Sequence, residues 1–213
     1  MARIGYFVFP LKGGNLLKDF GTAAILCGGE SRRMGFDKSE IKVDDKLLIE
    51  IIAETLEQVF ENIILISNDK EKFKHTKYKV VQDIIQRAGP AGGIYTALNY
   101  ASSKYVFITA CDMPIINLNY IEYMMEVIKS KNVEGIAAYN CGQLEPLYAF
   151  YSIDMISTFK DQLEKNNFKI FELISHCNMH YVIDEKVREY SKDMNIFTNL
   201  NYKSDLKHLQ KNS

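Results

Sequence analysis

The hydrophobic and polar positions divide most of the chain into short apolar runs and longer amphipathic segments. Apolar runs at residues 22–27, 62–67, 79–82 and 105–110 predict strands that are buried on both faces. Apolar residues at helical spacing predict helices at 46–60 and 89–101, and a third that is capped by Asn117 or Asn119 and ends near Ser130. This alternation predicts an α/β fold: a three-layer, doubly wound, mostly parallel sheet with helices on both faces.

The second half of the sequence has a less regular pattern. Strands are expected at 135–139 and 147–151, with residues 143–146 between them, and again at 179–183. Helices are expected at 152–164, starting on a Ser152 cap, at 169–176 and at 204–209. The charged run from 69 to 79 is expected to be a solvated connection. Because no linker rich in Ser, Gly or Pro interrupts the chain, one domain is expected.

Composition narrows the class of protein. The 213 residues are 47% hydrophobic and 25% charged, which is ordinary for a soluble globular protein. A net charge of −1 gives no overall field that would attract nucleic acid or an anionic membrane. The four cysteines lie far apart without a C-x-x-C pair, which favours reduced thiols in a cytoplasmic protein. The apolar run at residues 4–9 is too short to span a bilayer. We therefore expect neither nucleic-acid nor membrane partners.

The richest candidate chemistry lies at residues 22–38, TAAILCGGESRRMGFDK. Gly28 and Gly29 end the first buried strand and let the backbone approach a ligand without a Cβ in the way. Arg32, Arg33 and Lys38 then supply three cations within a few residues. A glycine-rich turn with free N–H groups and converging cations suits an anionic phosphate chain. The spacing matches neither a Walker A loop nor the G-x-G-x-x-G of dinucleotide folds.

Polar residues also follow three other predicted strands. Like Gly28, the residues Asn68, Asp83 and Asp112 come directly after apolar runs. In a doubly wound sheet, ligands bind outside the carboxyl ends of the strands, so these residues are expected to share one site. Asp112 is a lone carboxylate leaving a buried strand and suits Mg²⁺; the alternative is that it caps the turn before Pro114.

The segment L-C-G-G-E-S-R-R-M-G-F-D-K resembles the motif of the molybdenum cofactor guanylyltransferases, within the nucleotidyltransferases. Four later segments agree in order: V-V-Q-D at 80–83, G-P-A-G-G-I at 89–94, C-D-M-P at 111–114, and E-P-L-Y-A at 145–149. F-T-N-L-N at 197–201 agrees as well, and the resemblance spans residues 21–209. It implies a Rossmann-like fold of the nucleotide-diphospho-sugar transferase type. Residues 1–20 are then an N-terminal extension and residues 21–213 a single nucleotidyltransferase domain.

This resemblance implies that the chain transfers GMP from GTP to the terminal phosphate of molybdopterin and releases pyrophosphate. It assigns catalysis to Lys38 and Asp112, with Mg²⁺ on Asp112. Asn199 and Asn201, two residues apart on an extended segment, are assigned to the pterin substrate or to a second metal contact. Other molybdenum cofactor biosynthesis proteins and molybdoenzyme chaperones are implied partners. The nucleotide-binding residues that it implies are Leu26, Cys27, Gly28, Gly29, Arg33, Lys38, Asn68, Asp83 and Asp112.

Two other functions are compatible with the same residues. A cytidylyltransferase acting on molybdopterin or on a sugar or polyol phosphate would share the fold and the loop. Asp37 before Lys38, and Asp83 before the Gly89-Pro90 turn, favour the guanylyl version of the motif. A nucleotide-binding regulator without turnover is the other alternative, and the presence of Lys38 and Asp112 argues against it.

Overall fold

A seven-stranded sheet forms the centre of the protein in this computed structural model, which describes residues 18–28, 41–43 and 46–200. The strand order is β5-β4-β1-β6-β8-β7-β9. Strands β5, β4, β1 and β6 are mutually parallel, β8 runs antiparallel to both neighbours, and β9 is parallel to β7. The predicted doubly wound, mostly parallel sheet is therefore confirmed. The strands are β1 (Thr22–Leu26), β4 (Asn62–Ile66), β5 (Lys79–Val81), β6 (Tyr105–Ala110), β7 (Gly135–Asn140), β8 (Gln143–Ser152) and β9 (Met179–Val182).

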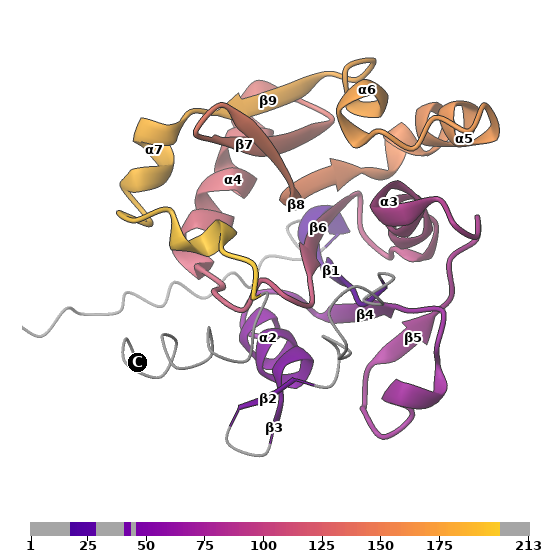
Figure 1. Cartoon of the computed structure of the whole chain (residues 1–213). Helices are drawn as coiled ribbons and strands as arrows, with labels where there is room; N and C mark the ends of the chain where they lie inside the picture. Colours follow the sequence, from indigo (N-terminus) through magenta and orange to yellow (C-terminus); the bar gives the residue numbers. More distant parts are fainter. Residues whose placement is uncertain (1–17, 29–40, 44–45, 201–213) are drawn as a thin grey trace, which may run out of the picture.

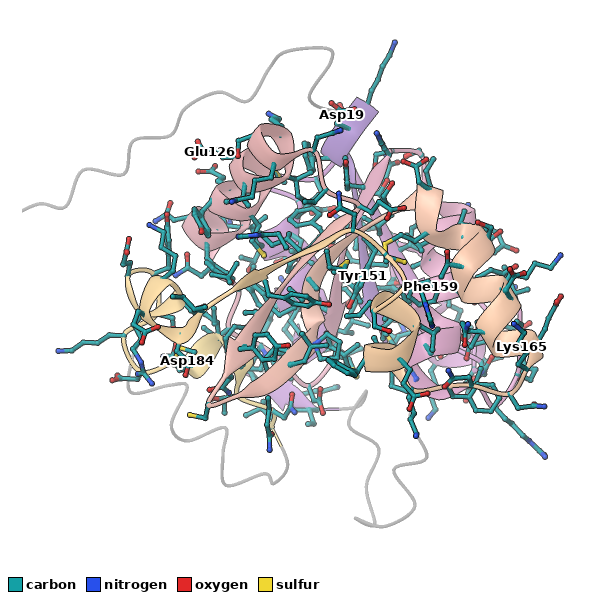
Figure 2. All side chains as sticks on the ribbon, turned by 90° about the horizontal axis from the view of Figure 1, so that it is seen from above. Asp19, Glu126, Tyr151, Phe159, Lys165 and Asp184 are labelled. Carbon is teal, nitrogen blue, oxygen red and sulfur yellow. The ribbon has the colours of Figure 1, made fainter. Side chains whose placement is uncertain are left out.

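Helices cover both faces of this sheet and complete the three layers (Figure 1). One face packs against α3 (Gly89–Tyr100), α5 (Ile156–Glu164) and α6 (Ile170–Ile174). The other packs against α2 (Leu48–Leu56), α4 (Leu118–Lys131) and α7 (Asp184–Arg188). Figure 2 shows Tyr151 of β8 beside Phe159 of α5, and their ring centroids are 6.2 Å apart in an edge-to-face contact. Strands β1 and β6 are buried along their whole length, and β4 is buried except at Asn62. The predicted burial of the run at 79–82 is wrong, because β5 is an edge strand on which only Val81 is buried.

The start of α4 links a local signal to the sheet. The Asn117 side chain accepts a hydrogen bond from the Tyr120 N–H at 3.0 Å, which confirms the predicted cap. The Asn117 N–H in turn donates to the Tyr148 hydroxyl on β8 at 2.8 Å. Tyr148 is fully buried, so this bond fixes the helix start against the sheet.

Three element boundaries differ from the sequence prediction. Helix α2 begins at Leu48, because β3 (Lys46–Leu47) pairs with β2 (Lys42–Val43). Residues 143–146, which we expected between two strands, belong to β8. A two-residue turn with positive φ at Cys141 (51°) and Gly142 (78°) makes β7 and β8 a tight hairpin. The segment 69–79 is not wholly solvated, since η3 (Glu71–Phe73) buries Phe73 in the core.

The remaining elements agree in part with the prediction. The helix expected at 152–164 forms as η4 (Ile153–Met155) followed by α5, and the Ser152 hydroxyl accepts from the Asp154 N–H. Helix α7 and η5 (Asn195–Phe197) were not predicted. The expected helix at 204–209 lies outside the described residues.

Phe20 stacks on Tyr105 at 5.1 Å between ring centroids and contacts Phe150 at 5.7 Å. It is therefore part of the core, although the division of the chain at residue 20 stays a prediction. Within the described ranges, none of the helices is both long enough and apolar enough to cross a membrane.

Candidate functional site

The carboxyl ends of β1 and β6 flank the point where the strand order reverses. From β1 the chain proceeds to β4 and β5 on one side, then crosses back through α3 to β6 on the other. The parallel ladder continues past the strand ends: the Cys111 N–H donates to the Leu26 carbonyl at 3.0 Å, and the Cys27 N–H donates to the Ile66 carbonyl at 2.8 Å. Such a reversal is where doubly wound sheets bind ligands.

Four of the predicted site residues follow the carboxyl ends of four neighbouring strands at this edge. The last paired residues are Leu26, Ile66, Val81 and Ala110, which neighbour one another across β1, β4, β5 and β6. Counting two residues onward along each strand gives Gly28, Asn68, Asp83 and Asp112. We call these four residues the carboxyl-edge row. Parallel register therefore brings together residues that are far apart in the sequence.

Asn68 and Asp83 form a reciprocal pair within the carboxyl-edge row. The Asn68 Nδ2 donates to Asp83 Oδ2 at 2.8 Å, and the Asp83 backbone N–H donates to Asn68 Oδ1 at 3.1 Å. Gln86 Nε2 donates to Asn68 Oδ1 at 3.2 Å and to the Asp83 carbonyl at 2.9 Å. The carboxylate is thus held in a fixed orientation beside the ends of β4 and β5.

Asp112 lies next to the returning C-terminal segment. The Leu200 N–H donates to the Asp112 carbonyl at 2.8 Å, which places Asn199 beside the end of β6. The preceding η5 is anchored by Phe197, whose ring meets Tyr148 edge-on at 5.8 Å. Four predicted site residues fall outside the described residues and their placement is not given: Gly29, Arg33, Lys38 and Asn201.

Comparison with known families identifies the type of domain. The sequence profile of the MobA-like NTP transferase domain matches residues 23–176. The chain belongs to this family. The nucleotidyltransferase resemblance inferred from the sequence is confirmed.

Similar proteins carry consistent names. A probable molybdenum cofactor guanylyltransferase of Peptoclostridium acidaminophilum is 38% identical over 195 residues, covering 89% of this chain and 88% of that protein. A molybdenum cofactor guanylyltransferase of Syntrophotalea carbinolica is 40% identical over 186 residues, covering 87% and 89%. The crystal structure of molybdopterin-guanine dinucleotide biosynthesis protein A from Archaeoglobus fulgidus superposes with a TM-score of 0.77 at 24% identity, covering 89% of this chain and 97% of that one. That structural likeness shows the shared fold.

In this MobA-like NTP transferase the electrostatics of Asp83 are unusual. Burial raises the pKa of the Asp83 carboxyl, and the hydrogen bond from Asn68 opposes that shift. Its second oxygen, Oδ1, is buried and is one of the few buried side-chain atoms without a hydrogen-bond partner in the described part of the chain. A buried acceptor without a donor is costly, so a ligand N–H that reached Oδ1 would remove that cost.

Cys27, one of the predicted nucleotide-binding residues, carries a thiol whose environment favours the neutral form. Burial raises the pKa of Cys27 well above its ordinary value, and the neighbouring Cys111 raises it further. The Cys27 Sγ donates to the Ile25 carbonyl at 3.3 Å. A thiol held in this way is a poor nucleophile.

The donor set around Asp112 fits a hard divalent cation that arrives with a phosphate ligand. Among residues 18–28, 41–43 and 46–200, no three His, Cys, Asp or Glu side chains gather as a metal cage. Mg²⁺ usually binds through one or two carboxylates and completes its shell with water and substrate phosphates. Asp112 offers one carboxylate, and the backbone bond from Leu200 brings the neighbouring residue Asn199 to the same segment, so the residue types fit such a cation.

Sequence reasoning missed two side chains of the site. Gln86 bridges Asn68 and Asp83, and Gln82 Nε2 donates to the Asn68 carbonyl at 3.0 Å. Both flank Asp83 in the segment Q-D-I-I-Q, whose polar residues follow a buried strand. That spacing is the signal from which their role could have been inferred.

Proposed function

We propose that this chain is a molybdenum cofactor guanylyltransferase that transfers GMP from GTP to the terminal phosphate of molybdopterin. An oxygen of that phosphate attacks the α-phosphorus of GTP in line, a new P–O bond forms, and pyrophosphate leaves. The observation that supports it most is the carboxyl-edge row. This row brings a glycine of the loop, the Asn68–Asp83 pair and Asp112 to the same edge of the sheet, beside the switch point. The names of the relatives support the choice of substrates.

In this proposal the protein acts by placement and charge neutralisation. Asp83 accepts hydrogen bonds from the N1–H and N2–H₂ of guanine, and Asn68 orients its carboxylate. The strand-ending residues Leu26, Cys27 and Gly28 let the triphosphate approach the backbone, and Gly29, Arg33 and Lys38 extend that contact.

Asp112 would hold Mg²⁺, and Asn199 and Asn201 would each serve as a pterin contact or as a second contact to the metal. Bound Mg²⁺ would neutralise charge on the phosphates. Cytoplasmic residence follows from the supply of both substrates, and other cofactor biosynthesis proteins and molybdoenzyme chaperones are expected partners.

Nucleotide selectivity tests the proposal directly. Purified protein with Mg²⁺ is titrated calorimetrically with GTP, CTP, ATP and UTP. A site that is built to pair with guanine rejects a base that lacks the matching donors, because its buried polar groups are then left unpaired. GTP should bind most tightly. If CTP binds as tightly as GTP, the cytidylyltransferase alternative replaces this proposal.

The division of labour between Asp112 and Lys38 provides the second test. Asp112→Asn removes one charge but little volume, so turnover should fall at least about a hundredfold while the fold survives. Lys38→Ala should weaken GTP binding as well as turnover, because a lysine on the phosphates acts in both the ground and transition states. Near-normal GMP transfer by Asp112→Asn at limiting Mg²⁺ would make Asp112 a turn residue. If the wild-type protein releases no pyrophosphate, the alternative of a nucleotide-binding regulator without turnover is favoured.

A further inference from the structure

A second Asn–carboxylate pair lies at the same edge of the sheet and has no role in the proposed reaction so far. Asn140 Nδ2 on β7 donates to Glu145 Oε1 on β8 at 3.0 Å. This repeats the bond from Asn68 Nδ2 to Asp83 Oδ2, at 2.8 Å. Both carboxyl groups are half-buried. In both, burial raises the pKa and the asparagine hydrogen bond opposes the rise.

The antiparallel pairing of β8 with β6 places Glu145 at the carboxyl edge of the sheet. Strands β6 and β8 are antiparallel and their last pair is Thr109 with Tyr148. Beyond that pair β8 continues toward its amino end through Glu145, at the same edge of the sheet where the chain leaves β6 through Asp112. The amino end of β8 therefore meets the carboxyl end of β6 at the switch point.

A bulge in β8 accompanies this arrangement. In the pairing of β8 with β7, Phe150 is opposite Ile136, and the next paired residue of β8, Glu145, is opposite Ala138. Residues 146–149 of β8 thus face a single residue of β7. Bulges of this kind redirect side chains and are frequent next to active sites. The hairpin tip beyond it is fixed, because the Cys141 N–H donates to Asp184 Oδ2 of α7 at 2.9 Å; Asp184 is labelled in Figure 2.

The two pairs lie on opposite sides of the switch point between β1 and β6. Asp83 follows β5 and Glu145 lies on β8, with β4, β1 and β6 between them. Four strand spacings of about 4.8 Å separate β5 from β8 by roughly 19 Å. An extended dinucleotide with a ring at each end and its phosphates in the middle spans a distance of that order.

We propose that the Asn140–Glu145 pair binds the pterin ring of the acceptor, in the way that the Asn68–Asp83 pair is proposed to bind guanine. This inference rests on the proposed function. Pterin and guanine share the same 2-amino-4-oxopyrimidine edge, which presents an N–H and an adjacent NH₂ as paired donors. A carboxylate that accepts both satisfies that edge, whereas it would repel a phosphate. One enzyme that joins two such rings needs this recognition twice, once on each side of the reacting phosphates.

The alternative is that Glu145 only secures the β7–β8 hairpin through Asn140. Glu145→Gln separates the two roles, because the amide oxygen still accepts from Asn140 while its NH₂ cannot accept from the pterin edge. Glu164→Gln, on the exposed surface of α5, is the matched control. Asp83→Asn is the reciprocal variant on the guanine side.

The experiment measures KM for molybdopterin and for GTP separately, and the competition by two added ring compounds. The first is 6-hydroxymethylpterin phosphate and the second is its 2,4-dioxo analogue, which lacks the 2-amino donor. In Glu145→Gln, KM for molybdopterin should rise roughly tenfold to a hundredfold, with KM for GTP within about twofold of wild type. The wild-type preference for the pterin over the dioxo compound should disappear. In Asp83→Asn, KM for GTP should rise while KM for molybdopterin stays within about twofold of wild type. Glu164→Gln should change neither KM.

An unchanged KM for molybdopterin in Glu145→Gln, or an unchanged preference between the two ring compounds, overturns the inference and leaves the proposed function intact. Equal rises in both KM values would make Glu145 a structural residue and overturn it as well. If the wild-type protein transfers no GMP to molybdopterin, the proposed function fails and the inference fails with it.

Discussion

Asn68→Ala isolates the role of the residue that orients Asp83. The substitution removes three hydrogen bonds of the Asn68 side chain: one to Asp83 Oδ2, one from the Asp83 N–H and one from Gln86. These bonds lie at the exposed edge of the sheet, so each is taken at the low end of the usual range, ~0.5 kcal/mol. The expected loss of stability is therefore about 1.5 kcal/mol, measured by urea unfolding.

The effect on nucleotide binding should exceed what this loss of stability explains. Without Asn68, the Asp83 carboxylate loses its orientation, and we expect the Kd for GTP to rise about tenfold, equivalent to about 1.4 kcal/mol. The pKa of Asp83 should rise further, because the bond that lowers it is gone. Only the ionised carboxylate accepts from guanine, so GTP affinity should fall as the pH decreases through that pKa, at a higher midpoint in the variant.

The stability of the protein should respond to pH in the opposite direction. The folded protein binds the Asp83 proton more tightly than the unfolded chain, since the folded pKa is raised. This group therefore adds stability below its unfolded pKa and loses that contribution as the pH rises through the folded pKa. Asn178→Ala, at an exposed position away from the row, is the control. An unchanged Kd for GTP and an unshifted pH midpoint in Asn68→Ala would refute the positioning role.

Two further substitutions test the packing that supports the site. Gly135→Ala should destabilise the protein by about 2 kcal/mol or more in urea unfolding. The added Cβ would lie 2.6 Å from the Met179 sulfur and 2.7 Å from the Phe150 carbonyl oxygen. A loss of stability below about 0.5 kcal/mol would contradict that crowding. Tyr148→Phe leaves the Asn117 N–H without its acceptor and should cost about 1–2 kcal/mol; equal stability of this variant and wild type would show that the bond contributes nothing.

The sequence by itself determined the order and type of the central elements. The apolar runs that became β1, β4 and β6 are charge-poor, and each is followed two residues later by Gly28, Asn68 or Asp112, a pattern that favours a buried strand. Asn117 was predictable as a cap because its side chain acts on a backbone N–H three residues away. The glycine-rich loop and Asp112 were found from their position after those strands, and the family followed from their residues.

Local signals were insufficient where distant parts of the chain decide the structure. The tight β7–β8 hairpin depends on a positive φ at Cys141, and cysteine is not a residue type from which a positive φ is predicted. The Asn68–Asp83 pair required the parallel register of β4 with β5, and the contact of Leu200 with Asp112 required the C-terminal segment to return across the sheet. Glu145 belonged to a recognisable motif, but only the antiparallel insertion of β8 beside β6 placed it at the same edge of the sheet as Asp112. Residue types and spacing therefore determined which groups are available, and sheet register decided which of them meet, because pairing between strands depends on contacts that no local stretch of sequence contains.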